Sequence, residues 1–111
     1  TTKEYVNLVA ALNNREVLDE DAYFTIGEVL EFPMENKAFQ AAFKHFGAKG
    51  GSTPYVLTHV AYLTKKDGTR MEMAIFFNDL SPAEEKKLEG WLDPFEAQVI
   101  FDPGYAAKLR F

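Results

Sequence analysis

Cysteine is absent from this 111-residue sequence, and histidine occurs only twice. A chain without thiols forms no disulfide, has no cysteine nucleophile and holds no zinc finger or iron–sulfur cluster. Neither His45 nor His59 has a metal-ligand spacing such as HxH or HExxH. The sequence therefore predicts no metal site and no cofactor.

Long apolar runs are also missing. No stretch approaches the roughly 18 consecutive apolar residues of a membrane span, and no basic segment followed by an apolar stretch marks a signal peptide. We interpret the start at Thr1 as the result of removing an initiator methionine or a tag. Together with the absence of cysteine, these features predict a soluble, cytoplasmic protein with no membrane contact.

Catalytic motifs are equally scarce. Neither Ser52 nor Ser81 lies in a GxSxG motif. The segment 47–52 lacks the GxxxxGK[ST] order and precedes a predicted strand instead of a helix, so we expect no phosphate site there. An N-terminal nucleophile at Thr1 is disfavoured because that class of enzyme needs a larger, layered fold. The sequence favours a protein that is not an enzyme.

Aromatic residues, in contrast, are plentiful: the chain has ten Phe, five Tyr and one Trp. The hydrophobic fraction of 47% and the charged fraction of 26% are typical of globular proteins. A chain of this length fits one domain with one hydrophobic core. We therefore expect residues 1–111 to form a single, aromatic-rich domain.

Three segments place apolar residues at helical spacing, near 2–13, 35–46 and 82–92. Capping-box signals begin the first helix at Thr1 and the third at Ser81. Gly47 is the expected left-handed C-cap of the second helix. The third is expected to end at Asp93–Pro94.

Hairpin signals predict the strands. Asp67-Gly68 joins two β-rich runs, which predicts a hairpin over about 55–78, although the sequence leaves open which of its faces meets the core. A second hairpin is expected over about 96–111, around a turn at 102–104. Residues 22–32 fit either a strand or a helix. The predicted fold class is α+β, an antiparallel sheet packed against helices.

Charge is unevenly distributed along the chain. Residues 1–36 carry eight acidic and two basic side chains, whereas residues 37–70 carry six basic side chains and one acidic one. The basic segment has Tyr55 and Tyr62 nearby for base stacking, but the isoelectric point near 5.0 argues against nucleic acid as a partner. The acidic residues that form a predicted protein-binding face are Glu16, Asp19, Glu20, Asp21, Glu28, Glu31 and Glu35.

These observations lead to one main hypothesis and two alternatives. The main hypothesis is a small interaction protein, such as an inhibitor, adaptor or regulator, that binds another protein through this acidic face or through an exposed aromatic sheet edge. The first alternative is a small-molecule-binding or hydrolytic domain with a pocket at His59 and Glu72, next to Arg70. The second is a homodimer formed through an edge strand at 105–111.

Overall fold

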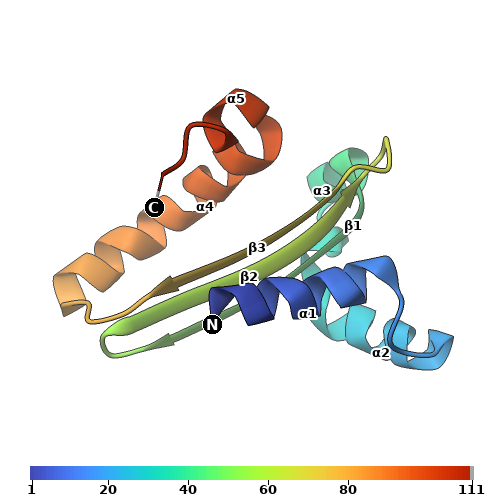
Figure 1. The fold of residues 1–111 in the computed structure, drawn as a ribbon, viewed down its shortest axis with the longest axis horizontal. Helices are drawn as coiled ribbons and strands as arrows, with labels where there is room; N and C mark the ends of the chain where they lie inside the picture. The colour runs from blue at the N-terminus through green and yellow to red at the C-terminus, as the bar shows by residue number, and fades with distance from the viewer. Residues whose placement is uncertain (111) are drawn as a thin grey trace. The chain divides into compact units, whose positions relative to one another are not determined.

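The computed structural model describes residues 1–110 and has an α+β fold (Figure 1). Its sheet has three antiparallel strands in the order β1-β2-β3. The helical elements are α1 (Thr2–Asn14), α2 (Glu20–Leu30), the 3₁₀ helix η1 (Phe32–Glu35), α3 (Lys37–Ala42), α4 (Pro82–Phe101) and α5 (Pro103–Ala106), and the strands are β1 (Phe43–Thr53), β2 (Val56–Lys65) and β3 (Arg70–Phe77). Among the described residues, every helix is too short or too polar to be a membrane-spanning segment.

The chain divides into two compact units. The first unit contains residues 1–51 and 58–76, and the second contains residues 52–57 and 77–111. The first unit therefore holds most of the sheet with the helices that precede it, whereas the second holds α4, α5 and the turn between β1 and β2.

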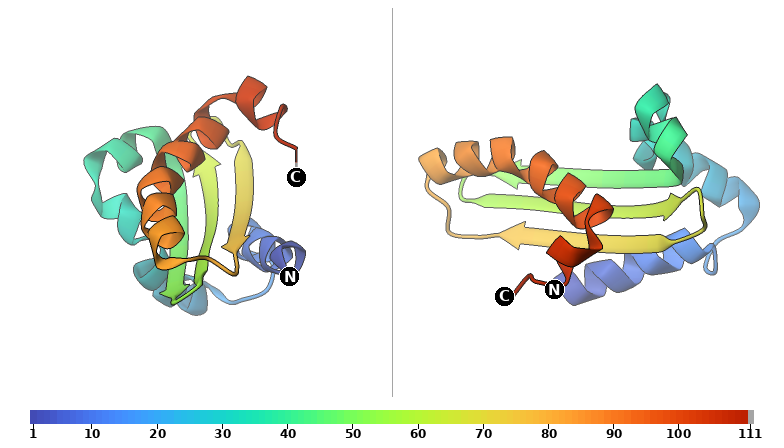
Figure 2. Two further views of the ribbon diagram at one scale, coloured as in Figure 1. Left: turned by 90° about the vertical axis from the view of Figure 1, so that its left-hand side faces the viewer. Right: turned by 90° about the horizontal axis from the view of Figure 1, so that it is seen from above.

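In the first unit, α1 runs along β3 (Figure 2) and packs on one face of the sheet. Val9 of α1 is buried against Val60 and Tyr62, and Tyr5 meets the edge of the Phe76 ring with 5.2 Å between ring centroids. Side chains alternate between the two faces of a strand, so the even-numbered residues of β2 and β3 form the face that α1 covers. Odd-numbered Ala61 and Leu63 of β2 are buried as well, so neither face of this strand is the solvent face.

The strongest local signals correctly predicted three elements. Both capping boxes are present, at Thr1 with Glu4 and at Ser81 with Glu84. The hairpin over 55–78 is formed by β2 and β3, and Gly68 in its turn has φ 90°. Residues 22–32, which fitted a strand or a helix, belong mainly to α2, whose N-cap Asp19 accepts a hydrogen bond from the Ala22 N–H at 2.8 Å.

The prediction of one helix over 35–46 is wrong beyond Ala42. The chain turns there into β1, which contains Gly47, so this residue is not the left-handed C-cap that the sequence predicted. The rings of Phe39, Phe43 and Phe46 still cluster, with centroids 4.9 to 5.8 Å apart, because a helix that leads into a strand also brings them together. Apolar spacing alone did not distinguish these two backbones.

The second hairpin, expected over 96–111, is also wrong within the described residues. Helix α4 continues through Pro94 to Phe101, and α5 follows. Buried Leu92, Phe95 and Ile100 lie on both sides of the proline at helical spacing, so their packing favours a continued helix over the break that Pro94 would otherwise cause. No edge strand is found over 105–110, and Phe111 lies outside the described residues.

Candidate functional site

Six of the seven acidic residues singled out in the sequence are exposed to solvent. Glu16 lies in the connection before α2, Asp19 caps this helix, and Glu35 ends η1. Acidic groups at a helix N-terminus interact favourably with the helix dipole, so part of this acidity stabilises α2. Of the remaining three exposed residues, Glu20 and Asp21 lie in the first turn of α2 and Glu28 lies near its end.

Large apolar side chains are exposed between these acids. Phe24 is 69% exposed and Val29 is 67% exposed. Glu20, Phe24 and Glu28 are spaced four residues apart and therefore lie in one row along α2. We call this region the α2 surface; it consists of Glu16, Val17, Leu18, Asp19, Glu20, Asp21, Phe24, Glu28, Val29 and Phe32, all of them exposed.

The seventh acidic residue, Glu31, points inward at the end of α2. One carboxylate oxygen accepts a hydrogen bond from the Tyr62 hydroxyl at 3.0 Å, and the other lies 3.2 Å from Nδ1 of His45. Its side chain is 20% exposed. Glu31 therefore links α2 to β1 and β2 and does not contribute to the acidic face.

A polar hollow surrounds this cluster, with Asn13, Arg15 and Tyr23 completing its polar wall. The Arg15 guanidinium lies 5.6 Å from the centre of the Tyr23 ring. The hollow encloses about 20 Å³, which is enough for a single water molecule and too little for an organic substrate. Its residues thus form a structural connection between elements.

Burial is the main reason that the pKa of the Tyr62 hydroxyl lies well above its ordinary value of 10.0. The charge of Glu31 and the hydrogen bond from Tyr62 to that carboxylate raise this pKa further. Tyr62 therefore remains a protonated hydrogen-bond donor at neutral pH.

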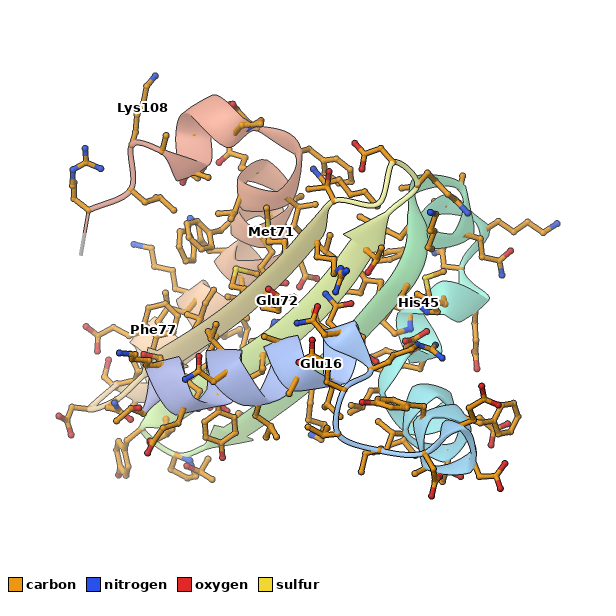
Figure 3. All side chains as sticks on the ribbon, turned by 45° about the vertical axis from the view of Figure 1, so that its right-hand side comes forward. Glu16, His45, Met71, Glu72, Phe77 and Lys108 are labelled. Atoms are coloured by element: carbon orange, nitrogen blue, oxygen red, sulfur yellow. The ribbon has the colours of Figure 1, made fainter. Side chains whose placement is uncertain are left out.

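His59 and Glu72 lie on opposite faces of the sheet. Glu72 shares the face of Ala74, beside α1 (Figure 3), whereas His59 alternates with Val60 and points to the other face. Glu72 accepts a hydrogen bond from the Asn13 amide at 2.7 Å. The structure therefore does not form the polar pair on which the predicted pocket depended.

Arg70, the third residue of the predicted pocket, is exposed and donates a hydrogen bond to the side chain of Asn14. The neighbouring Asn13 also donates to the Leu63 carbonyl at 3.0 Å and accepts from the Thr64 hydroxyl at 2.9 Å. Consecutive asparagines at the end of α1 thus attach this helix to β2 and β3. The sequence pattern predicted only that the first helix ends near residue 13.

The outer strand β1 has an exposed segment at Lys49, Gly50 and Gly51. Edge strands present backbone N–H and C=O groups that can pair with another chain. Glycine within a strand is typical of a place where another backbone or a ligand approaches closely. This segment is an exposed part of one edge strand of the sheet, and β3, which carries Phe76, is the other edge strand.

Residues 1–110 contain no group of three or more His, Asp or Glu side chains placed to hold a metal ion. No protein-family model, curated protein sequence or solved structure matches this chain. The functional interpretation therefore depends on the geometry alone.

Proposed function

We propose that this protein is an interaction module that binds another protein through the α2 surface. The observation that carries the proposal is the exposure of Phe24, Val29 and their apolar neighbours among acidic side chains. Helix capping explains Asp19, but it gives no reason for an exposed phenylalanine on the same helix. A partner with a basic surface around an apolar pocket would complement both features.

Site-specific photo-crosslinking tests this proposal. A photoreactive phenylalanine analogue replaces Phe24 in one variant and Phe101, which is 60% exposed in the second unit, in a matched variant. In extract from the source cells, we expect a discrete protein adduct from position 24 that weakens as salt is added, and none from position 101.

Binding of the purified partner then separates the apolar from the electrostatic contribution. We expect Phe24→Ser to weaken binding by about tenfold or more, as removal of a central aromatic anchor does. Glu20→Lys should slow association, whereas Glu89→Lys, with the same charge change on α4, should not. Adducts from both positions or from neither would contradict the proposal.

The exposed edge of β1 supports a second candidate, the binding of an extended peptide at Lys49, Gly50 and Gly51. Backbone pairing would protect amides of this segment from hydrogen exchange. Gly50→Pro should abolish that protection, because proline has no N–H group and is poorly accommodated in a paired strand. Unchanged exchange at these three amides in the presence of an extended-peptide library would rule this candidate out.

A further inference from the structure

An apolar groove lies within the second unit, between the end of β3 and the first turns of α4. Its walls are formed by Phe77, Leu80, Leu88 and Trp91, and its volume is about 430 Å³. This volume lies within the range of small-molecule sites in proteins, which are mostly apolar with a few polar groups. Trp91 remains 42% exposed although its ring stacks on Phe95 at 4.3 Å.

Backbone contacts hold the wall at Leu80 in place. The Leu80 N–H donates to the Tyr55 carbonyl at 3.0 Å, and the preceding Asp79 has a left-handed φ of 57°. The Leu80 side chain itself is buried. The groove is therefore already formed without a ligand, which lowers the entropic cost of binding.

Two charged side chains, Glu84 and Lys87, complete the lining of the groove. Oε2 of Glu84 accepts hydrogen bonds from the Ser81 hydroxyl at 2.6 Å and from the Ser81 N–H at 2.8 Å, at the N-terminus of α4. These hydrogen bonds lower the pKa of Glu84, so this carboxylate stays ionised and engaged with the helix cap. Within residues 1–110, no carboxylate forms an ion pair with Lys87.

We infer that this groove binds a small amphipathic carboxylate, whose apolar chain lies against Trp91 and Leu88 and whose carboxylate pairs with the Lys87 ammonium. The apolar walls favour the chain, and the single uncommitted cation selects one anionic group. This site is independent of the α2 surface, which lies in the first unit.

Trp91 is the only tryptophan in the sequence, so its fluorescence reports directly on the groove. Decanoate, below its micelle concentration, is a suitable probe. We expect a saturable change in Trp91 emission, and an affinity that falls by about fourfold for each methylene removed from the chain.

Lys87→Met, which removes the charge and keeps an apolar stem, should weaken decanoate binding by about tenfold, as expected for one charge-assisted hydrogen bond. Lys86→Met is the matched control and should leave the affinity unchanged, because Lys86 does not line the groove. Decanol should bind both variants equally. Circular dichroism verifies that each variant is folded.

Three results would overturn the inference. The first is a Trp91 emission that does not change or does not saturate with decanoate. The second is an equal loss of affinity in the Lys86 and Lys87 variants, which would indicate a general charge effect. The third is equally tight binding of decyltrimethylammonium, which has the same chain and the opposite charge.

Discussion

The ring of Tyr62 occupies the space that a side chain at Gly47 would need. A Cβ atom at position 47 would lie 2.3 Å from Cε1 and Cζ of that ring, far inside van der Waals contact. The Tyr62 ring is buried, and its hydroxyl donates to Glu31, so it has little freedom to move. Glycine at position 47 thus makes room for the central aromatic side chain of the sheet.

We therefore expect Gly47→Ala to lower the free energy of unfolding by about 3 kcal/mol, at the upper end of overpacking costs. Gly50→Ala is the matched control, because a Cβ there would meet the His59 ring at an ordinary 3.5 Å. It should change stability by less than about 0.5 kcal/mol. Urea denaturation measures both, and equal stability of the two variants would show that the Tyr62 ring moves freely.

The raised pKa of Tyr62 predicts a loss of stability at alkaline pH. In the unfolded chain this hydroxyl ionises near its ordinary pKa of 10.0, while in the folded protein it stays protonated to higher pH. Above pH 10 the unfolded state thus binds fewer protons, and the free energy of unfolding falls by at most about 1.4 kcal/mol per pH unit.

Tyr62→Phe isolates this contribution, because it removes only the Tyr62 hydroxyl. At pH 8 the variant should be less stable by about 1 kcal/mol, the value of one hydrogen bond. Between pH 10 and pH 11 the difference in the free energy of unfolding between the unsubstituted protein and Tyr62→Phe should shrink. A constant difference in urea denaturation over this interval would contradict the proposed environment of Tyr62.

Local signals predicted those elements of the fold that local chemistry determines. Two capping boxes and the Asp67-Gly68 turn fix backbone conformation over a few residues, so α1, the start of α4 and the β2–β3 hairpin were predictable. The transition from α3 to β1 was not predictable from local signals. Gly47 was expected to end a helix, yet it lies in β1, where a Cβ atom would overlap the ring of Tyr62, fifteen positions away along the chain.

The sequence predicted which acidic residues belong to the candidate site, but not the direction in which each side chain points. Glu28 and Glu31 are the same residue type three positions apart, yet Glu28 faces solvent and Glu31 faces Tyr62. The direction of Glu31 depends on a partner 31 residues away. The pairing of His59 with Glu72 was excluded by the register of β2 against β3, which the sequence alone left open.

Asn13 and Asn14 should respond in opposite ways to conversion to aspartate. In Asn13→Asp, a carboxylate replaces the amide that donates to Glu72 and to the Leu63 carbonyl, so we expect a loss of about 3 kcal/mol. Asn14→Asp should be neutral or slightly stabilising, because it places an exposed carboxylate beside Arg70.

Adding Glu72→Gln to the Asn13→Asp variant should restore part of the lost stability, since glutamine can donate to the new carboxylate. Urea denaturation at pH 7 measures all three variants. Similar losses for the two single aspartate variants would mean that the Asn13 amide does not anchor α1.

Tyr55, in the two-residue connection between β1 and β2, has a backbone conformation that is unfavourable for a residue other than glycine. Its φ of 78° lies in the left-handed region, and its side chain is 59% exposed. Tyr55→Gly should therefore be more stable than Tyr55→Ala by about 1 kcal/mol, because only glycine adopts this φ without strain. Thermal unfolding compares the two, and an alanine variant at least as stable as the glycine variant would refute the prediction.

Pro94 provides the sharpest test of the continuous helix α4. Within a helix, proline removes the N–H that would bond to the carbonyl four residues earlier, here that of Gly90. Pro94→Ala should restore this bond and raise the free energy of unfolding by about 1 to 3 kcal/mol. Pro82→Ala is the matched control, because proline is well accommodated at the first turn of a helix, and it should bring no gain. If α4 instead ended at Asp93, the two variants would show the same stability in urea denaturation.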